Sequence, residues 1–347
     1  MKSLNQRDSV MVQPVVKESF NAFLIDKSDD GSIKSGLSIL SVNQLDVGEV
    51  TIKVAFSSVN YKDALAATGT GKIIRRFPCV GGIDLAGEVV HSTDSRFKAG
   101  AKVVATAFDI GVSHHGGYAE YARVPADWVV DLPDGLSLLE SMALGTAGFT
   151  AALGIVRMEA NDLAPENGLV AVTGATGGVG SLAIDMLAKL DYQVVAVTSK
   201  STESEYLRNL GAADIKLTST IDLTKIKPLE SAQWAGAIDN VGGALLSWLI
   251  ATMKRAGTVA SIGNVASAQL NSTVLPFILR GVSLVGVDSG YLPHRIRKQV
   301  WERLGTDLKP RHLMEITKVV DLETLPQCFD DFVKGRVKGR TVVRIGG

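Results

Sequence analysis

The stretch LVAVTGATGGVGSLAIDMLAKL, residues 169–190, decides the fold of this chain. Its apolar start predicts a buried strand, its glycines form a turn, and residues 181–190 have the apolar pattern of a helix. A second apolar strand at residues 193–199 completes a βαβ unit. Such a turn lets a pyrophosphate approach backbone N–H groups at the positive end of the helix. The stretch therefore predicts a dinucleotide-binding unit, whereas a simple tight turn would need only one glycine.

The pyrophosphate contacts are expected in this turn. Gly177 and Gly178 have no Cβ to hold phosphates away, and Gly180 lets the helix pack closely on its strand. We expect Thr176 and Val179 to complete the contact.

The end of the second strand predicts which nicotinamide cofactor binds. In NAD-binding units an Asp or Glu at this point bonds the ribose 2′-OH. Here the sequence reads Thr198, Ser199, Lys200, and a lysine with a hydroxyl can bind the 2′-phosphate that an acid would repel. We therefore predict NADP(H). The alternative is that Lys200 is an ordinary solvated lysine and that Glu203 or Glu205 serves as the acid.

Composition excludes several classes of function. Lys+Arg and Asp+Glu both number 36, so the formal net charge is +0 and no global field attracts nucleic acid or an anionic membrane. The two cysteines, Cys79 and Cys328, form neither a metal cluster nor a disulfide framework, which favours a reducing compartment. The N-terminus lacks a charged-then-apolar secretory pattern. We expect a cytoplasmic protein.

The 347 residues favour two domains. Many short strands with glycine turns before residue 136 suggest a small β-barrel-like domain. Strands and helices then alternate, which predicts α/β architecture with a doubly wound parallel sheet. The last helices and strand do not extend this alternation, so we expect them to return to the first domain. We predict a flexible N-terminal arm at 1–19, one domain at 20–143 and 290–347, a nucleotide-binding domain at 144–289, and the site in the cleft between them.

Several motifs carry a family resemblance, and they occur in order along the chain: SVNYKDAL (58–65), GKIIRRFP (71–78), GIDLAG (82–87), GTAGFTA (145–151), VTGATGGVG (172–180), WAGAID (234–239), PFILR (276–280), GVDS (286–289) and GRT (339–341). The chain resembles the medium-chain dehydrogenase/reductase superfamily in its zinc-independent, quinone-oxidoreductase-like branch, and within that branch the acrylyl-CoA reductase family. The resemblance implies a GroES-like β-barrel catalytic domain plus a Rossmann domain.

The resemblance also implies an activity, which is NADPH-dependent reduction of the carbon–carbon double bond of acrylyl-CoA to propanoyl-CoA. Related zinc enzymes have a His-Glu pair where this chain has Ile83 and Asp84, and a four-cysteine lobe where it has residues 107–117. Two cysteines cannot build that lobe, so we expect no metal site. His114 and His115 lie in this loop and more simply form a polar turn.

The family pattern places Tyr61 beside the nicotinamide, where its phenol could orient the thioester, bond the cofactor or donate a proton; the structural alternative is a packed tyrosine that bonds backbone. Asn60 could donate to a carbonyl, and Asp63 could brace its neighbours. Both could instead satisfy local backbone. Further cofactor contacts are expected from residues spread along the chain: Thr146, Asn240, Leu284, Lys298 and Arg340.

Two features concern partners. Lys72, Arg75 and Arg76 form a basic group that could contact the phosphates of CoA or could be a solvated loop. In this superfamily the strand at residues 283–286 commonly pairs with its copy in another subunit, which hides an apolar edge, and we predict a homodimer.

Two other functions are consistent with the same residues. One is an NADPH-dependent reductase of quinones or general α,β-unsaturated carbonyls, which shares the cofactor chemistry but does not recognise CoA. The other is an NADPH-binding protein without turnover.

Overall fold

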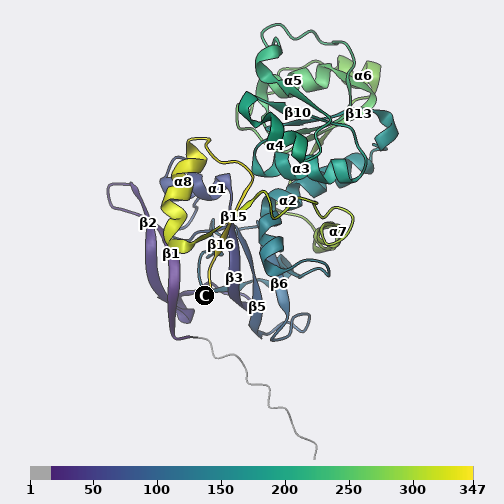
Figure 1. Cartoon of the computed structure of the whole chain (residues 1–347). Coiled ribbons are helices and arrows are strands. Elements are labelled where there is room, and N and C mark those ends of the chain that lie inside the picture. Colours follow the sequence, from purple (N-terminus) through teal and green to yellow (C-terminus); the bar gives the residue numbers. More distant parts are fainter. Residues whose placement is uncertain (1–16, 347) are drawn as a thin grey trace, which may run out of the picture.

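The computed structural model describes residues 17–346, so the predicted arm lies almost wholly outside the described residues. The described residues begin and end in one β-rich part and cross to a second, α/β part between (Figure 1). The helix that joins the two parts is α2 (Leu138–Glu159).

The β-rich part contains two sheets. The larger has the order β15-β16-β3-β5-β6-β8, with β7 also paired to β3, and the smaller has the order β2-β1-β4. The C-terminal strand β16 pairs with β3, so the end of the chain does return to the first part, as expected. The strands are β1 (Ser19–Lys27), β2 (Ile33–Ser41), β3 (Val50–Val59), β4 (Cys79–Val80), β5 (Asp84–Ser92), β6 (Lys102–Thr106), β7 (Tyr121–Val124), β8 (Val129–Asp131), β15 (Thr317–Asp321) and β16 (Arg340–Arg344).

The helices of this part are α1 (Tyr61–Thr68), α7 (His294–Leu304) and α8 (Leu325–Val333). Helix α1 packs against α8, and both cover the core of the two sheets. This core contains Phe23, Tyr118 and Phe329, whose rings meet edge-on or tilted at centroid distances of 5.6 to 6.4 Å.

The α/β part is a six-stranded sheet in the order β11-β10-β9-β12-β13-β14, with every neighbouring pair parallel. Numbered from the first strand, this order is 3-2-1-4-5-6, which confirms the predicted doubly wound sheet and puts its switch point between β9 and β12. The elements are β9 (Val170–Thr173), α3 (Gly178–Lys189), β10 (Val194–Thr198), α4 (Ser204–Asn209), β11 (Asp214–Leu217), β12 (Trp234–Asp239), α5 (Gly243–Ala251), β13 (Met253–Ser261), α6 (Leu275–Arg280) and β14 (Ser283–Gly286).

The apolar composition of helix α2 is explained by its position in the core. By length and composition it could span a membrane, but 78% of its apolar window lies inside the protein, against α3, α7 and the larger β sheet. The sequence predicts two helices here, at residues 137–142 and 145–156, and the non-helical backbone of Gly145 (φ 51°, ψ −154°) does divide α2 into two helical segments.

The sequence patterns did not reveal α1, α6 or the strands β2, β11 and β15. Strand β11 is an edge strand with no fully buried residue, so its sequence lacks the apolar run that marked β9 and β10. Helix α6 has only six residues and exposes Ile278 and Leu279, so its sequence does not show the apolar spacing by which a helix is recognised.

Candidate active site

A cleft of about 930 Å³ lies between the two parts, and the glycine-rich turn lines it. Gly174 adopts a φ of +59°, and a Cβ on Gly180 would lie 2.4 Å from the Gly174 carbonyl oxygen. Helix α3 therefore approaches β9 more closely than any other residue at position 180 would permit. Gly177 and Gly178 line the cleft at the start of α3, where backbone N–H groups can bind an anion.

Asn240 stands beside the switch point of the sheet, directly after β12. Its Nδ2 donates to the Thr173 carbonyl at 2.7 Å, which fixes the orientation of the amide. Its Oδ1 is then buried without a hydrogen-bond partner while the residue lines the cleft. An orphaned buried acceptor is costly, and a hydroxyl or amide N–H of a bound dinucleotide would satisfy it.

Asp239 holds the turn that presents this amide. Its carboxylate accepts from the Thr173 hydroxyl at 2.7 Å and from the Gly242 N–H at 2.9 Å. Burial raises the pKa of this carboxyl. The turn is therefore tied to β9 and does not move freely.

Thr198, Ser199 and Lys200 line the other end of the cleft, at the end of β10. The Lys200 ammonium donates to the Gly335 carbonyl at 3.0 Å, across the mouth. Glu203, one of the acids weighed as an alternative, accepts from Lys338 at 2.9 Å and does not line the cleft. The residues at the cleft therefore fit a 2′-phosphate better than a free 2′-hydroxyl.

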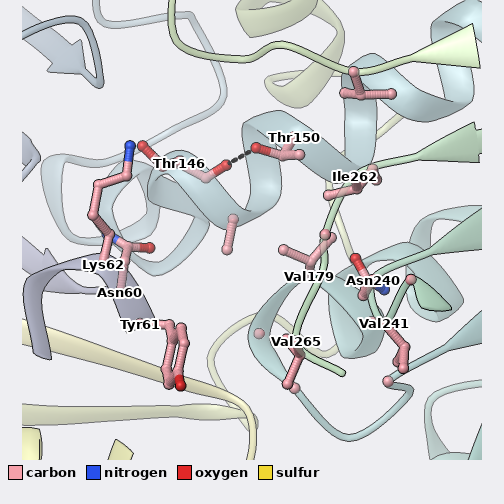
Figure 2. A pocket seen from close by; sticks show the side chains of 18 of the residues that line it. Asn60, Tyr61, Lys62, Thr146, Thr150, Val179, Asn240, Val241, Ile262 and Val265 are labelled. Carbon is pink, nitrogen blue, oxygen red and sulfur yellow. Dashed lines mark hydrogen bonds between the residues drawn. The ribbon is translucent and has the colours of Figure 1, made fainter. Parts of the chain in front are cut away.

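On the β-rich side, α1 begins directly after Asn60 and places Tyr61 in the cleft with its side chain 46% exposed. Figure 2 shows Asn60, Tyr61 and Lys62 together on one side of the pocket, opposite Val179 and Val265.

Asp63 does not reach the cleft. It is 2% exposed, and its two oxygens accept the backbone N–H groups of Asn60 and Ile83 at 2.8 and 3.0 Å. Burial, with a smaller contribution from the charge of Asp84, raises its pKa to about 7. The carboxyl thus braces the start of α1, and the structure does not offer it to a substrate.

Asp84 is the centre of a buried hydrogen-bond network. It accepts from the Ser58 hydroxyl at 2.6 Å and from Asn60 Nδ2 at 2.8 Å. It also accepts from the backbone N–H and the hydroxyl of Thr146, at 2.9 and 2.5 Å. Since Thr146 follows the kink in α2, this carboxylate caps the second half of that helix from another element. Asp84 therefore fixes both Asn60 and Thr146 at the cleft.

Arg340 completes this network from β16. It is 2% exposed, and its guanidinium donates to the carbonyl of Ala143 at 2.8 Å, to the hydroxyl of Ser58 at 3.1 Å and to Asn60 Oδ1 at 3.4 Å. Burial lowers its pKa from the ordinary value. The sequence predicts Arg340 as a cofactor contact; the structure places it in the lining of the cleft, where it also supports Asn60, and the contact with a cofactor stays a prediction.

This network also changes the expectation for Asn60. Its amide oxygen accepts from Arg340 and its amide nitrogen donates to Asp84, so most of its bonding capacity is used inside the protein. Gly178 in the glycine turn packs against Arg340, with 3.2 Å between a Cβ built there and the arginine Cδ. The network therefore joins the β-rich side of the cleft, where Asn60 lies, to the glycine-rich turn.

Sequence reasoning missed Arg297. This arginine is fully buried, lies over the rings of Phe108 and Phe149 at 4.3 and 4.9 Å, and donates to carbonyl oxygens of residues 106, 289 and 290. Burial lowers its pKa to about 10. A signal existed, because Arg297 shares the apolar face of α7 with Val300 and Trp301 at helical spacing.

Two predicted cofactor residues lie outside the cleft. Leu284 lies in the edge strand β14, partly buried against the core of the α/β part. Lys298 is exposed on α7, with 3.9 Å between its ammonium and the Glu302 carboxylate. Of the basic group, only Arg75 lines the cleft. The other predicted residues that line it are Asn60, Tyr61, Thr146, Thr176, Gly177, Gly178, Val179, Thr198, Ser199, Lys200, Asn240 and Arg340.

The histidines of the 107–117 loop bond to backbone. His115 Nδ1 accepts from the Val80 N–H at 3.0 Å, and His114 Nε2 lies 2.7 Å from the Arg123 carbonyl oxygen. Burial lowers the pKa of His115 and raises that of Cys79 to about 12. Within residues 17–346, no three His, Cys, Asp or Glu side chains are grouped to hold a metal ion.

Comparison with known proteins agrees with this architecture. Residues 46–134 match the family described as alcohol dehydrogenase GroES-like domain, and residues 178–306 match the family described as zinc-binding dehydrogenase. The chain is 46% identical to "Putative quinone oxidoreductase YhfP" of Bacillus subtilis, over 94% of this chain and 99% of that protein. It is 45% identical to "Acrylyl-CoA reductase AcuI" of Ruegeria pomeroyi, with the same coverage.

Solved structures give the same result. The yhdH oxidoreductase of Salmonella enterica, in complex with NADP, has a TM-score of 0.91 at 44% identity and covers 94% of this chain and 100% of its own. YhfP of Bacillus subtilis, with NAD bound, has a TM-score of 0.93 at 45% identity and covers 95% and 100%. The GroES-like and Rossmann domains predicted from the sequence are thereby confirmed, and the chain belongs to the medium-chain dehydrogenase/reductase family, in the group that includes YhfP, AcuI and YhdH.

Proposed function

We propose that this protein is an NADPH-dependent acrylyl-CoA reductase. The observation that carries the proposal is a single cleft that joins a glycine turn and a lysine-bearing strand end to Tyr61, in a chain 45% identical to an acrylyl-CoA reductase over nearly its full length. The reaction converts acrylyl-CoA, NADPH and a proton into propanoyl-CoA and NADP⁺. A hydride adds to the β-carbon and a proton to the α-carbon.

The residues present fit NADP. Lys200 and Ser199 supply a cation and a hydroxyl at the 2′-phosphate end, the start of α3 supplies N–H groups, and Asn240 supplies an unpartnered acceptor at the switch point. When bound, the cofactor supplies the hydride. NAD is bound in the solved structure of the relative YhfP, and the ratio of kcat/KM for NADPH and NADH tests the preference proposed here.

On the substrate side, the cleft must hold the thioester and stabilise charge on its carbonyl oxygen. Conjugation with the carbonyl makes the β-carbon electrophilic, and negative charge develops on that oxygen as an enolate forms. We assign Tyr61 as the donor to this oxygen or to the α-carbon, because its phenol is the exposed hydroxyl at the start of α1. Asn60 and Asp63 act as positioning residues, through the network of Asp84 and Arg340.

The reaction is tested by following NADPH absorbance with acrylyl-CoA, a simple quinone and a free enone. We expect the highest kcat/KM with acrylyl-CoA. A quinone preferred by about tenfold, roughly 1.4 kcal/mol in transition-state binding, would support the quinone-reductase alternative that the name of YhfP raises. Bound NADPH without turnover on any of the three would support a non-catalytic protein.

Tyr61→Phe tests the assignment of the donor. We expect kcat for acrylyl-CoA to fall by about 100-fold, with little change in KM for NADPH. Tyr192→Phe is a matched control, because that phenol donates to the Leu163 carbonyl inside the α/β part and is not in the cleft. Equal kcat in Tyr61→Phe and wild type would remove Tyr61 from the mechanism.

We further propose a homodimer in the cytoplasm, with the domain division given above. The edge strand β14 follows α6 in the chain, and Val274, just before α6, and Ile278, within it, are 65% and 68% exposed. Such a surface is usually covered in an assembly. Light scattering of the purified protein tests the dimer, and a monomer at micromolar concentration would contradict it.

A further inference from the structure

The cations that line the cleft divide into two groups. Lys200 and Arg340 stand at the cofactor half, where Lys200 bonds Gly335 and Arg340 is buried in its network. Lys62 and Arg75 stand on the β-rich side and are exposed. Among the described residues Lys62 makes no ion pair, and the Arg75 side chain is 67% exposed. The second pair is therefore available to a ligand.

The surroundings separate these two from the other basic residues nearby. Arg76 forms a two-point ion pair with Asp46, at 2.5 and 2.6 Å, outside the cleft. Lys72 is exposed but does not line the cleft. Arg75 is only loosely held, since its nearest acid oxygen, on Asp109, is 3.6 Å away. An anion can replace that contact at small cost because the pair is solvated.

The site next to Arg75 is rigid. The backbone N–H of Arg75 donates to the Val112 carbonyl at 2.9 Å, and the Tyr291 hydroxyl donates to the Asp109 carboxylate at 2.8 Å. The Tyr291 ring meets Phe108 edge-on at 6.0 Å while the residue stays 56% exposed. The mouth of the cleft thus offers a solvated guanidinium, carried on anchored backbone, beside an aromatic surface.

We propose that Lys62 and Arg75 form a phosphate-binding rim that selects CoA thioesters over thioesters without phosphates. This inference rests on the proposed function. CoA carries three phosphate groups remote from the reacting double bond, and planar guanidinium suits phosphate oxygens. The rim gives binding energy that a quinone or a free enone cannot use. The negative charge of Asp109, next to Arg75, repels a phosphate and therefore weakens phosphate binding at the rim.

The experiment compares acrylyl-CoA with S-acrylyl-pantetheine, which has the same thioester but no phosphate. The measured quantity is the ratio of their kcat/KM values. We expect Arg75→Gln and Lys62→Gln each to lower this ratio about fivefold, the size expected for a solvated charge contact. Asp109→Asn should raise it. Lys72→Gln and Arg76→Gln, which remove equal charge outside the cleft, should leave it at the wild-type value.

Three other results would contradict the proposal, and each has a different meaning. If Arg75→Gln and Lys62→Gln lower kcat/KM for both thioesters equally, the rim does not read phosphate and the proposal is overturned while the reductase activity stands. If these variants instead raise KM for NADPH, the phosphates belong to the cofactor and the proposal is again overturned. If the wild type reduces neither thioester, the proposed function fails and the rim fails with it.

Discussion

Replacing Gly145 by alanine is expected to damage both the stability and the activity of the protein. The backbone there has φ 51° and ψ −154°, a conformation essentially reserved for glycine, and an alanine would cost about 1–3 kcal/mol in strain. The new Cβ would lie 2.6 Å from Asp84 Oδ2, 2.7 Å from the Ser58 hydroxyl and 2.8 Å from the Arg340 guanidinium. Relieving such contacts in a packed interior costs about 1–3 kcal/mol more.

The sum, about 2–6 kcal/mol, is a large share of the ~5–15 kcal/mol that stabilises typical folded proteins. The atoms displaced are those that hold Asn60 and Thr146 at the cleft, so we also expect kcat/KM of the folded variant to fall by at least about tenfold.

Gly154→Ala in the same helix is the matched control. Its nearest neighbours are side-chain carbons at 3.4 Å and beyond, with ordinary helical backbone, so alanine should be neutral or stabilise the helix by up to about 1 kcal/mol. Denaturant unfolding and steady-state kinetics of the two variants and wild type make the test. An unfolding free energy of Gly145→Ala within about 0.5 kcal/mol of wild type would refute the argument, because strain and contacts would then both be absent.

Three further outcomes are expected. Burial raises the pKa of Asp63 to about 7 from an ordinary 3.8, so between these pH values the native state binds a proton that the unfolded chain releases. The unfolding free energy should therefore fall as pH rises from about 4 to about 7, by at most ~1.4 kcal/mol per pH unit. Asp63→Asn should flatten this slope, as measured by urea titrations at several pH values. Asn240→Ala removes the unpartnered acceptor and should weaken NADPH binding about tenfold by titration calorimetry, with unchanged binding contradicting its cofactor role. Lys200→Glu should lower the NADPH-to-NADH ratio of kcat/KM by about 100-fold, and an unaltered ratio would show that the 2′-phosphate binds elsewhere.

Much of the cofactor side could be predicted because it is local. The glycine turn, its flanking strand and helix, and Thr198 to Lys200 lie within one βαβ unit, so their relative positions follow from strand and helix geometry. The alternation of strands and helices also predicted a doubly wound parallel sheet, whereas the strand order 3-2-1-4-5-6 came from the structure.

The catalytic side was harder to predict because its partners are distant in the chain. Asp84 and Arg340 come from β5 and β16, and only the pairing of β16 with β3 brings the arginine against Ser58 and Asn60. A buried guanidinium and a solvated one look alike in sequence, which is why the sequence did not predict the burial of Arg340 in this network or that of Arg297.

The sequence by itself determined that this chain has a nucleotide-binding βαβ core and a strand end suited to a phosphorylated ribose, and its family resemblance predicted Tyr61 at the nicotinamide. Only the tertiary structure decided that Asp63 is sealed from the cleft, that Lys298 and Leu284 lie outside it, and that Arg75 reaches it while Arg76 turns to Asp46. The reason is physical. The pattern of apolar residues that predicts a strand or helix lies within one short segment. The burial and pairing of a charged side chain depend instead on which distant segments pack against it.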